Sequence, residues 1–162
     1  DLPMLAKGDT LWLTTNYADG MSEYTALFAS TKDERGIGGF YSSLRSYVAT
    51  PTGIQTVKSW NVAAALDHYW APQYRSSFFA SYAALKAPAG AEASAWNGSG
   101  YFGDANVWNA GANFVWIPVR NFEIGAEVIY AQIKQDVRSP NLTVYSGTDS
   151  NWTGRLRVER NF

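Results

Sequence analysis

The chain has 162 residues with 13 Lys and Arg against 14 Asp and Glu, which suits a single domain and lacks the basic excess of a nucleic-acid-binding protein. Cys is absent and His occurs once, so a disulfide framework, a thiolate metal site and a cysteine nucleophile are excluded. Aromatic residues make up 15% of the chain, with 7 Trp and 10 Tyr. No run of about 18 apolar residues forms a transmembrane helix, but membrane-crossing β-strands are not excluded, because each carries a weak hydropathy signal.

The first predicted strand spans about residues 9–18, where apolar residues such as Leu11 and Leu13 alternate with polar ones. Trp12 falls on the polar parity of this strand. An indole is unexpected there unless it packs beneath a loop or at a subunit contact, or unless the register is shifted by one residue. The segment that follows, residues 19–56, is rich in Gly and Ser and is predicted to be a long loop.

Two hairpins of one design follow the long segment. Their four predicted strands span residues 57–70, 76–86, 105–117 and 122–135. The turn of each hairpin includes the Pro of a Trp-x-Pro motif, at 70–72 and at 116–118. When the hairpins are aligned on this motif, the same parity is apolar in both, which indicates an internal hairpin repeat.

The last predicted strand spans residues 152–162 and again alternates, with Leu156 and Val158 on one parity and basic residues on the other. The whole chain therefore has the pattern of an all-β protein with antiparallel strands. Its Pro-containing turns are short, whereas the long connections span residues 19–56, 87–104 and 136–151. Short turns at one end and long loops at the other are typical of a transmembrane β-barrel.

The apolar parity of the strands has the composition of a lipid-facing surface. Small residues such as Ala80 and Ala110 occupy the strand middles, whereas aromatic rings lie toward the strand ends. Charges on this parity occur only near strand ends, at Lys58, Lys86, Lys134 and Arg160. We therefore predict a lipid-interface girdle formed by Tyr17, Trp70, Trp108, Trp116 and Tyr130.

The opposite parity is polar and carries charges of both signs, which indicates contact with water. The predicted pore-lining residues on this face are Asp67, Tyr69, Glu123, Glu127, Arg155, Arg157 and Glu159. A soluble β-sandwich with its charged face in solvent would alternate in the same way and is the main alternative on the pattern alone. His68 falls on the apolar parity near the short turns, where we expect an interfacial role. No catalytic residue, metal site or cofactor is predicted.

Four stretches of the sequence resemble the general porins of alphaproteobacteria such as rhizobia and Brucella. They are HYWAPQYR at residues 68–75, DANVWN at 104–109, WIPVRNFEIG at 116–125 and RLRVERNF at 155–162. The similarity covers residues 57–162 and, less closely, 2–17, while residues 18–55 cannot be placed against the family. The resemblance implies a homotrimer of sixteen-stranded barrels, of which this chain is the C-terminal part beginning in a periplasmic turn.

The resemblance implies a water-filled channel for the passive diffusion of small hydrophilic solutes and ions across the bacterial outer membrane. The implied partners are outer-membrane lipid, lipopolysaccharide, further copies of the chain and the outer-membrane assembly machinery. Phe162 resembles the C-terminal aromatic signal that this machinery reads, whereas Arg160 stands where an apolar residue is usual. The family also has a constriction between basic wall residues and an acidic infolded loop, which has no counterpart in the aligned residues.

Two further alternatives stay open at this point. Six strands cannot close a barrel, so either the chain is a fragment of a longer porin or two more strands lie at about 23–29 and 39–48. The second case would give a small closed eight-stranded barrel with a packed lumen and no conductance. The alternative from another class is a soluble carbohydrate-binding β-sandwich whose exposed rings stack on sugars.

Overall fold

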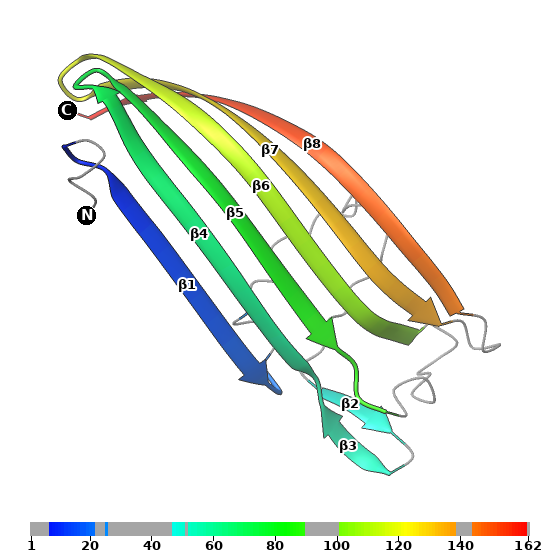
Figure 1. Cartoon of the computed structure of the whole chain (residues 1–162). Helices are drawn as coiled ribbons and strands as arrows, with labels where there is room; N and C mark the ends of the chain where they lie inside the picture. Colours follow the sequence, from blue (N-terminus) through cyan, green and yellow to red (C-terminus); the bar gives the residue numbers. More distant parts are fainter. Residues whose placement is uncertain are drawn as a thin grey trace.

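An open antiparallel sheet of six strands forms the main part of the computed structural model of the chain (Figure 1). The structure describes residues 7–21, 25, 47–50, 52–89, 101–138 and 144–161. The strands of the sheet are β1 (Thr10–Asp19), β4 (Lys58–Ala71), β5 (Tyr74–Lys86), β6 (Tyr101–Val119), β7 (Phe122–Arg138) and β8 (Val144–Arg160), in that spatial order. A separate hairpin consists of β2 (Tyr47–Thr50) and β3 (Gly53–Thr56). The described residues are therefore all-β, and each strand of the main sheet lies beside the next one along the chain.

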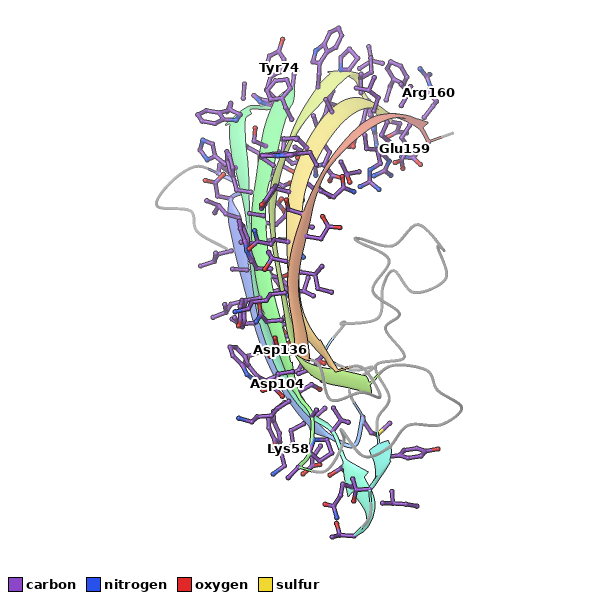
Figure 2. All side chains as sticks on the ribbon, turned by 90° about the vertical axis from the view of Figure 1, so that its right-hand side faces the viewer. Lys58, Tyr74, Asp104, Asp136, Glu159 and Arg160 are labelled. Carbon is purple, nitrogen blue, oxygen red and sulfur yellow. The ribbon has the colours of Figure 1, made fainter. Side chains whose placement is uncertain are left out.

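The sheet curves into a trough with a concave and a convex face (Figure 2). Glu159 points to the concave side and Arg160 points away from it, because successive residues of a strand alternate between faces. The register carries this alternation across the sheet, since direct partners on neighbouring strands share a face. One concave row runs through Asp67, Ser77, Asn113, Glu127 and Arg155. Each residue of the six strands can thus be assigned to one face.

The short turns lie at one end of the sheet, where β1 also begins and β8 ends (Figure 1). We term this the short-turn end and the opposite one the far end. Pro72 and Gln73 join β4 to β5, and Arg120 and Asn121 join β6 to β7. Asn121 adopts a left-handed conformation with φ 63°, which Asn tolerates better than most residues. The tight turn predicted between the strands at 105–117 and 122–135 is confirmed at Arg120 and Asn121, whereas Pro118, predicted to be in the turn, lies in β6.

The six long strands lie where the sequence predicts them, but some extend further. β6 begins at Tyr101 and β8 at Val144, so the connections at 87–104 and 136–151 are shorter than predicted. The added residues of β8 pair with the end of β7, through partners such as Val144 and Arg138. Backbone pairing continues there although the polarity no longer alternates, because the ladder of hydrogen bonds does not depend on side-chain polarity.

The predicted loop at 19–56 contains the β2–β3 hairpin, which the sequence interpretation missed. Residues 47–50 and 53–56 pair through a tight turn in which Gly53 has φ 117°, a conformation that favours Gly. The two additional strands considered at about 23–29 and 39–48 lie outside the described residues, apart from Thr25 and the start of β2.

The concave face also holds a small apolar cluster near the far end. Val57, Ala83, Leu85 and Ala105 form this cluster, and all of them are buried. Asn61, on the same face, donates a hydrogen bond from Nδ2 to Thr25 O at 3.0 Å. The concave face is therefore polar over much of its length but apolar and buried near the far end, and this buried apolar cluster was not predicted.

Gly111 is a position where the sheet requires the absence of a side chain. A Cβ atom there would lie 2.5 Å from Phe79 Cζ and 2.8 Å from Val128 O. We expect Gly111→Ala to lower the free energy of unfolding by about 1–3 kcal/mol, because both neighbours must shift. Gly154→Ala is the matched control, since its nearest neighbour, Glu127 O, lies 4.0 Å away. Urea unfolding followed by circular dichroism measures both variants, and equal stabilities would contradict this role of Gly111.

Candidate functional site

The concave face carries ion pairs on its two C-terminal strands. Arg155 Nη2 lies 2.7 Å from Glu127 Oε1, which joins β8 to β7. Arg157 pairs with Glu159 on β8 itself. Both Arg side chains are about two-thirds exposed, at 66% and 67%, so each pair stays in contact with water. Exposed pairs of this kind add little stability, but they place charges of both signs along the concave face.

A second charged group lies on the concave face at the short-turn end. Arg75 Nη2 lies 3.5 Å from Glu123 Oε2, and the Arg75 guanidinium carbon lies 6.0 Å from the centre of the Tyr69 ring. Tyr69 in turn packs over Gly8, where an added Cβ would come within 3.3 Å of the ring. The sequence interpretation placed Arg75 in a turn and did not include it among the residues of the charged face. Arg75 is the direct partner of Tyr69, so the two side chains lie on the same face. The alternation along the strand could therefore have identified Arg75 as a residue of the concave face.

The register places all seven predicted pore-lining side chains on the concave face, namely Asp67, Tyr69, Glu123, Glu127, Arg155, Arg157 and Glu159. They do not form a single cluster. Asp67 accepts a hydrogen bond from Thr10 Oγ1 at 3.3 Å and belongs to β4, whereas the Glu127 pair belongs to β7 and β8. Strands β5 and β6 separate these two groups.

The convex face carries a band of aromatic side chains toward the far end. This far aromatic band consists of Tyr17, Trp60, Tyr82, Trp108, Tyr130 and Trp152, with one ring on each strand of the sheet. The Trp60 and Tyr82 rings lie 5.3 Å apart, those of Trp108 and Tyr130 5.0 Å, and those of Tyr130 and Trp152 4.9 Å. Trp60, Tyr82 and Trp152 were not predicted, although their parity indicated them.

A second aromatic band crosses the convex face at the short-turn end. This short-turn aromatic band consists of Trp70, Tyr74, Phe114, Trp116 and Phe122. The rings of Tyr74 and Phe114 stack with their centres 5.8 Å apart. The predicted girdle residues divide between the two bands, with Trp70 and Trp116 here and Tyr17, Trp108 and Tyr130 in the far aromatic band. The remaining members of the short-turn band were missed.

Small and aliphatic side chains fill the convex face between the two bands. They include Leu11, Leu13, Val62, Ala64, Leu66, Ala80, Ala110, Ala112, Ala126, Val128 and Leu156, and the aromatic Phe78 lies among them. Leu156 is 85% exposed and Leu13 is 69% exposed, so these side chains have no cover among the described residues. The eight residue-to-residue steps from Trp108 to Trp116 span about 27 Å along the strand, or about 20 Å across the membrane for a tilt of about 40°.

The Lys and Arg side chains of the convex face lie toward its two ends. Lys58, Lys86 and Lys134 lie on the far side of the far aromatic band, and Lys58 and Lys86 are direct partners. At the other end, the Arg160 guanidinium carbon lies 5.9 Å from the centre of the Phe122 ring. Among the described residues, the strip between the aromatic bands contains no Asp, Glu, Lys or Arg.

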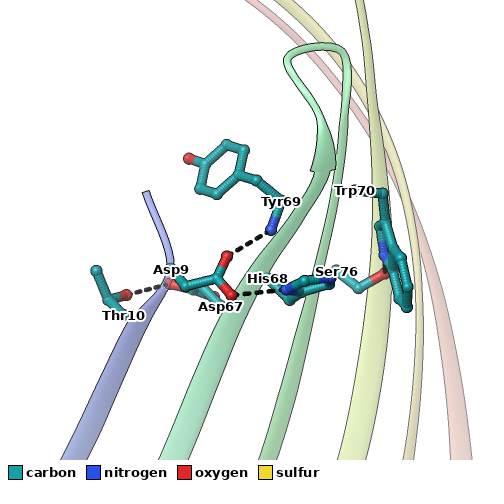
Figure 3. Close-up of polar contacts among 7 residues, drawn as sticks. All are labelled: Asp9, Thr10, Asp67, His68, Tyr69, Trp70 and Ser76. Carbon is teal, nitrogen blue, oxygen red and sulfur yellow. Dashed lines mark hydrogen bonds and ion pairs between the residues drawn. The ribbon is translucent and has the colours of Figure 1, made fainter. Parts of the chain in front are cut away.

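A buried carboxylate ties the start of β1 to β4 (Figure 3). Asp9 Oδ2 lies 2.7 Å from His68 Nδ1, while Asp9 Oδ1 accepts a hydrogen bond of 2.9 Å from Tyr69 N. The His68 ring meets the Trp70 ring edge-on at 4.4 Å, and Trp70 Nε1 donates to Ser76 Oγ at 3.0 Å. Asp9, His68 and Ser76 are thus neighbours across three strands, but the Ser hydroxyl bonds to the indole and not to the imidazole.

Comparisons of the chain with protein-family models, with curated proteins and with solved structures found no match. Within the described residues, no group of three or more His, Asp or Glu side chains could hold a metal ion. In the same part of the chain, no helix has the length and apolar character needed to span a membrane. The geometry of the two sheet faces is therefore the basis for inferring a function.

The contacts of Asp9 with His68 and Tyr69 are expected to stabilise the fold measurably. We expect Asp9→Ala to lower the free energy of unfolding by about 1–3 kcal/mol, because it leaves the partly buried Tyr69 N–H and the His68 ring without their acceptor. Asp9→Asn keeps an acceptor for Tyr69 N–H and is expected to lose less. Asp19→Ala, at the exposed far end of β1, is the control. Urea unfolding of the three variants tests this order, and equal losses at positions 9 and 19 would contradict it.

Proposed function

We propose that the chain is part of an outer-membrane porin whose convex face meets lipid and whose concave face lines a water-filled channel. The channel would allow passive diffusion of small hydrophilic solutes and ions. The observation that carries this proposal is the segregation of the two faces. The convex face has an uncharged strip between two aromatic bands, whereas the ion pairs of Arg75, Arg155 and Arg157 lie on the concave face.

The direction of the curvature favours a membrane barrel over a soluble sandwich. A soluble sheet that curves around a core turns its apolar face inward, toward the concave side. Here the largest apolar strip is on the outside of the curve, and Leu156 and Val158 are 85% and 67% exposed there. Soluble monomers rarely expose a continuous apolar surface of more than a few hundred Å². Acyl chains of a bilayer are the natural cover for such a face, because every backbone group of a paired strand is already bonded.

The distance between the two aromatic bands also fits the thickness of a bilayer. Lipid-facing bands of outer-membrane barrels are about 25 Å tall and are bounded by aromatic residues at both interfaces. The strip between Trp108 and Trp116 has a comparable height of about 20–27 Å, depending on tilt. Lys58 and Lys86, beyond the far aromatic band, would then lie at the level of lipid headgroups and lipopolysaccharide phosphates.

The open edges of the sheet support a barrel larger than these six strands. Within the described residues, β1 and β8 each have a neighbour on one side only. Unpaired edges do not persist in a membrane, since unbonded N–H and C=O groups cost several kcal/mol each in lipid. We propose that both edges pair with further strands of one barrel, and that the barrels form a trimer as the resemblance to porins implies. The assembly signal proposed at Phe162 lies outside the described residues.

Adjacent residues of β5 provide a test that separates the lipid-facing proposal from a soluble fold. Ala80 lies on the convex face midway between the bands, and Ser81 lies on the concave face. We expect Ala80→Arg to reduce the free energy of folding into lipid vesicles by about 2–4 kcal/mol, whereas Ser81→Arg is tolerated. The measurement is urea-dependent folding of the full-length protein into vesicles. Tolerance of Ala80→Arg, which an exposed position in water would show, would contradict the membrane assignment.

Ion conduction tests the channel itself. The full-length protein in a planar bilayer is expected to give large, stable current steps, whereas the described six-stranded sheet alone is not. A unit charge about 10 Å from a permeating ion in water changes its energy by about 0.4 kcal/mol, or about twofold in occupancy. Arg155→Glu should therefore increase the permeability to cations relative to anions, which is measured as a shift of the reversal potential in a salt gradient. Arg160→Gln on the convex face should leave the reversal potential unchanged. Absence of steps from a folded, inserted protein would favour a closed, non-conducting barrel.

A further inference from the structure

Trp12 is a large aromatic side chain on the polar side of the sheet. It lies on β1 directly opposite Ala65 of β4, and Ala65 lies directly opposite Phe79 of β5. The row belongs to the concave face, since Ala65 and Asp67 share one parity of β4. Trp12 is 56% exposed, so the described residues leave more than half of it uncovered. An indole exposed on a water-contacting wall has no role in the lipid-facing surface proposed above.

The neighbours of Trp12 leave its ring accessible. Ala65 stands between Trp12 and Phe79, and neighbouring strands are about 4.8 Å apart, so the two aromatic residues are about 10 Å apart. The Phe79 ring leans the other way, over Gly111, where an added Cβ would come within 2.5 Å of it. The Phe79 ring is therefore directed toward Gly111, and Trp12 is more than half exposed on the other side of Ala65.

Hydrogen-bonding groups border this aromatic row on the same face. Thr10 and Thr14 lie on either side of Trp12 along β1, and Thr10 Oγ1 donates to Asp67 Oδ2 at 3.3 Å. Asn16 and Asn61 are bonded to each other one step further along, with Asn16 Nδ2 2.9 Å from Asn61 Oδ1. An exposed ring beside hydroxyl and carboxylate groups matches the chemistry of a pyranose, which has an apolar face for stacking and hydroxyls at its edge.

We propose that Trp12, with Phe79, is a stacking site for the sugar rings of a saccharide that passes along the concave face. The site would make the channel more permeable to saccharides than to ions of similar size. This inference rests on the proposed channel, because the concave face is taken as a solute pathway. The backbones of Trp12 and Phe79 are about 10 Å apart, so an oligosaccharide lying across the strands can contact both side chains with different sugar units.

A covering segment of the chain itself is a less suitable occupant. Among the described residues between β1 and β2, Thr25 contacts this face, through a hydrogen bond from Asn61. Asn61 pairs with Asn16, so this contact lies toward the far end from Trp12. The indole stays more than half exposed with that contact in place.

Maltotriose is the probe for the test, and two measurements separate the site from the channel. The first is saccharide-dependent interruption of the ion current through the full-length protein in a planar bilayer. We expect Trp12→Ala to weaken maltotriose binding about tenfold, which is the loss of one stacking partner, and Trp12→Phe to weaken it less. Trp152→Ala, which removes an indole from the convex face, is the matched control and should bind as the unaltered protein does.

The second measurement needs no conduction and no destabilising variant. Fluorine NMR of the full-length protein containing fluorotryptophan, refolded in detergent, reports each indole, and Trp12→Phe assigns the Trp12 signal by its loss. A shift of that signal on addition of maltotriose is expected. No shift, or equal binding by Trp12→Ala, would overturn the saccharide site even in a conducting protein. A shift in a protein that never conducts would support the site and reject the channel.

Discussion

The structure depends on a single constraint, which is the common register of six antiparallel strands. Side chains alternate between faces with a period of two, so a slip of one residue in any pair would move its charged side chains to the convex face. The hairpin turns at Pro72 and at Asn121 hold the pairs in place, since each leaves only two residues between strands. The Asp9 carboxylate does the same at β1, where no short turn is available. Both faces owe their distinct chemistry to these few contacts.

The consequence is a sheet with its apolar strip on the outside of the curve and its charged side chains on the inside. Its convex face combines small residues in the middle with rings at two levels, while its concave face holds acidic and basic side chains in pairs. Paired charges that stay in contact with water require little compensation from the fold, unlike the same charges buried in a core. Near the far end the concave face changes character, because Val57 and Leu85 are buried there with Ala83 and Ala105. The concave face is therefore exposed to solvent at its ion pairs and buried near the far end.

Much of this arrangement could be predicted from the sequence, because period-two alternation and turn residues act locally. The positions of the six strands, the left-handed Asn121 and the separation of charged from aromatic side chains all follow from pattern. Features that depend on pairing across strands were missed. Arg75 follows a predicted turn closely in sequence, and only the pairing of strands brings Glu123 beside it. The contact between Asp9 and His68 joins residues that are 59 positions apart. The full lengths of β6 and β8 were missed because polarity stops alternating before the hydrogen bonds end.

The order of the strands has a consequence for how the sheet forms. β4, β5, β6 and β7 each pair with the next strand along the chain, and such local contacts allow fast, stepwise folding. β1 alone must reach its partner across the whole stretch from Asp19 to Lys58. The entropy lost in closing such a segment rises only with the logarithm of its length, about 0.6 kcal/mol for each doubling. That stretch can therefore gain or lose residues over evolution with little effect on stability, while the two-residue turns at the opposite end cannot.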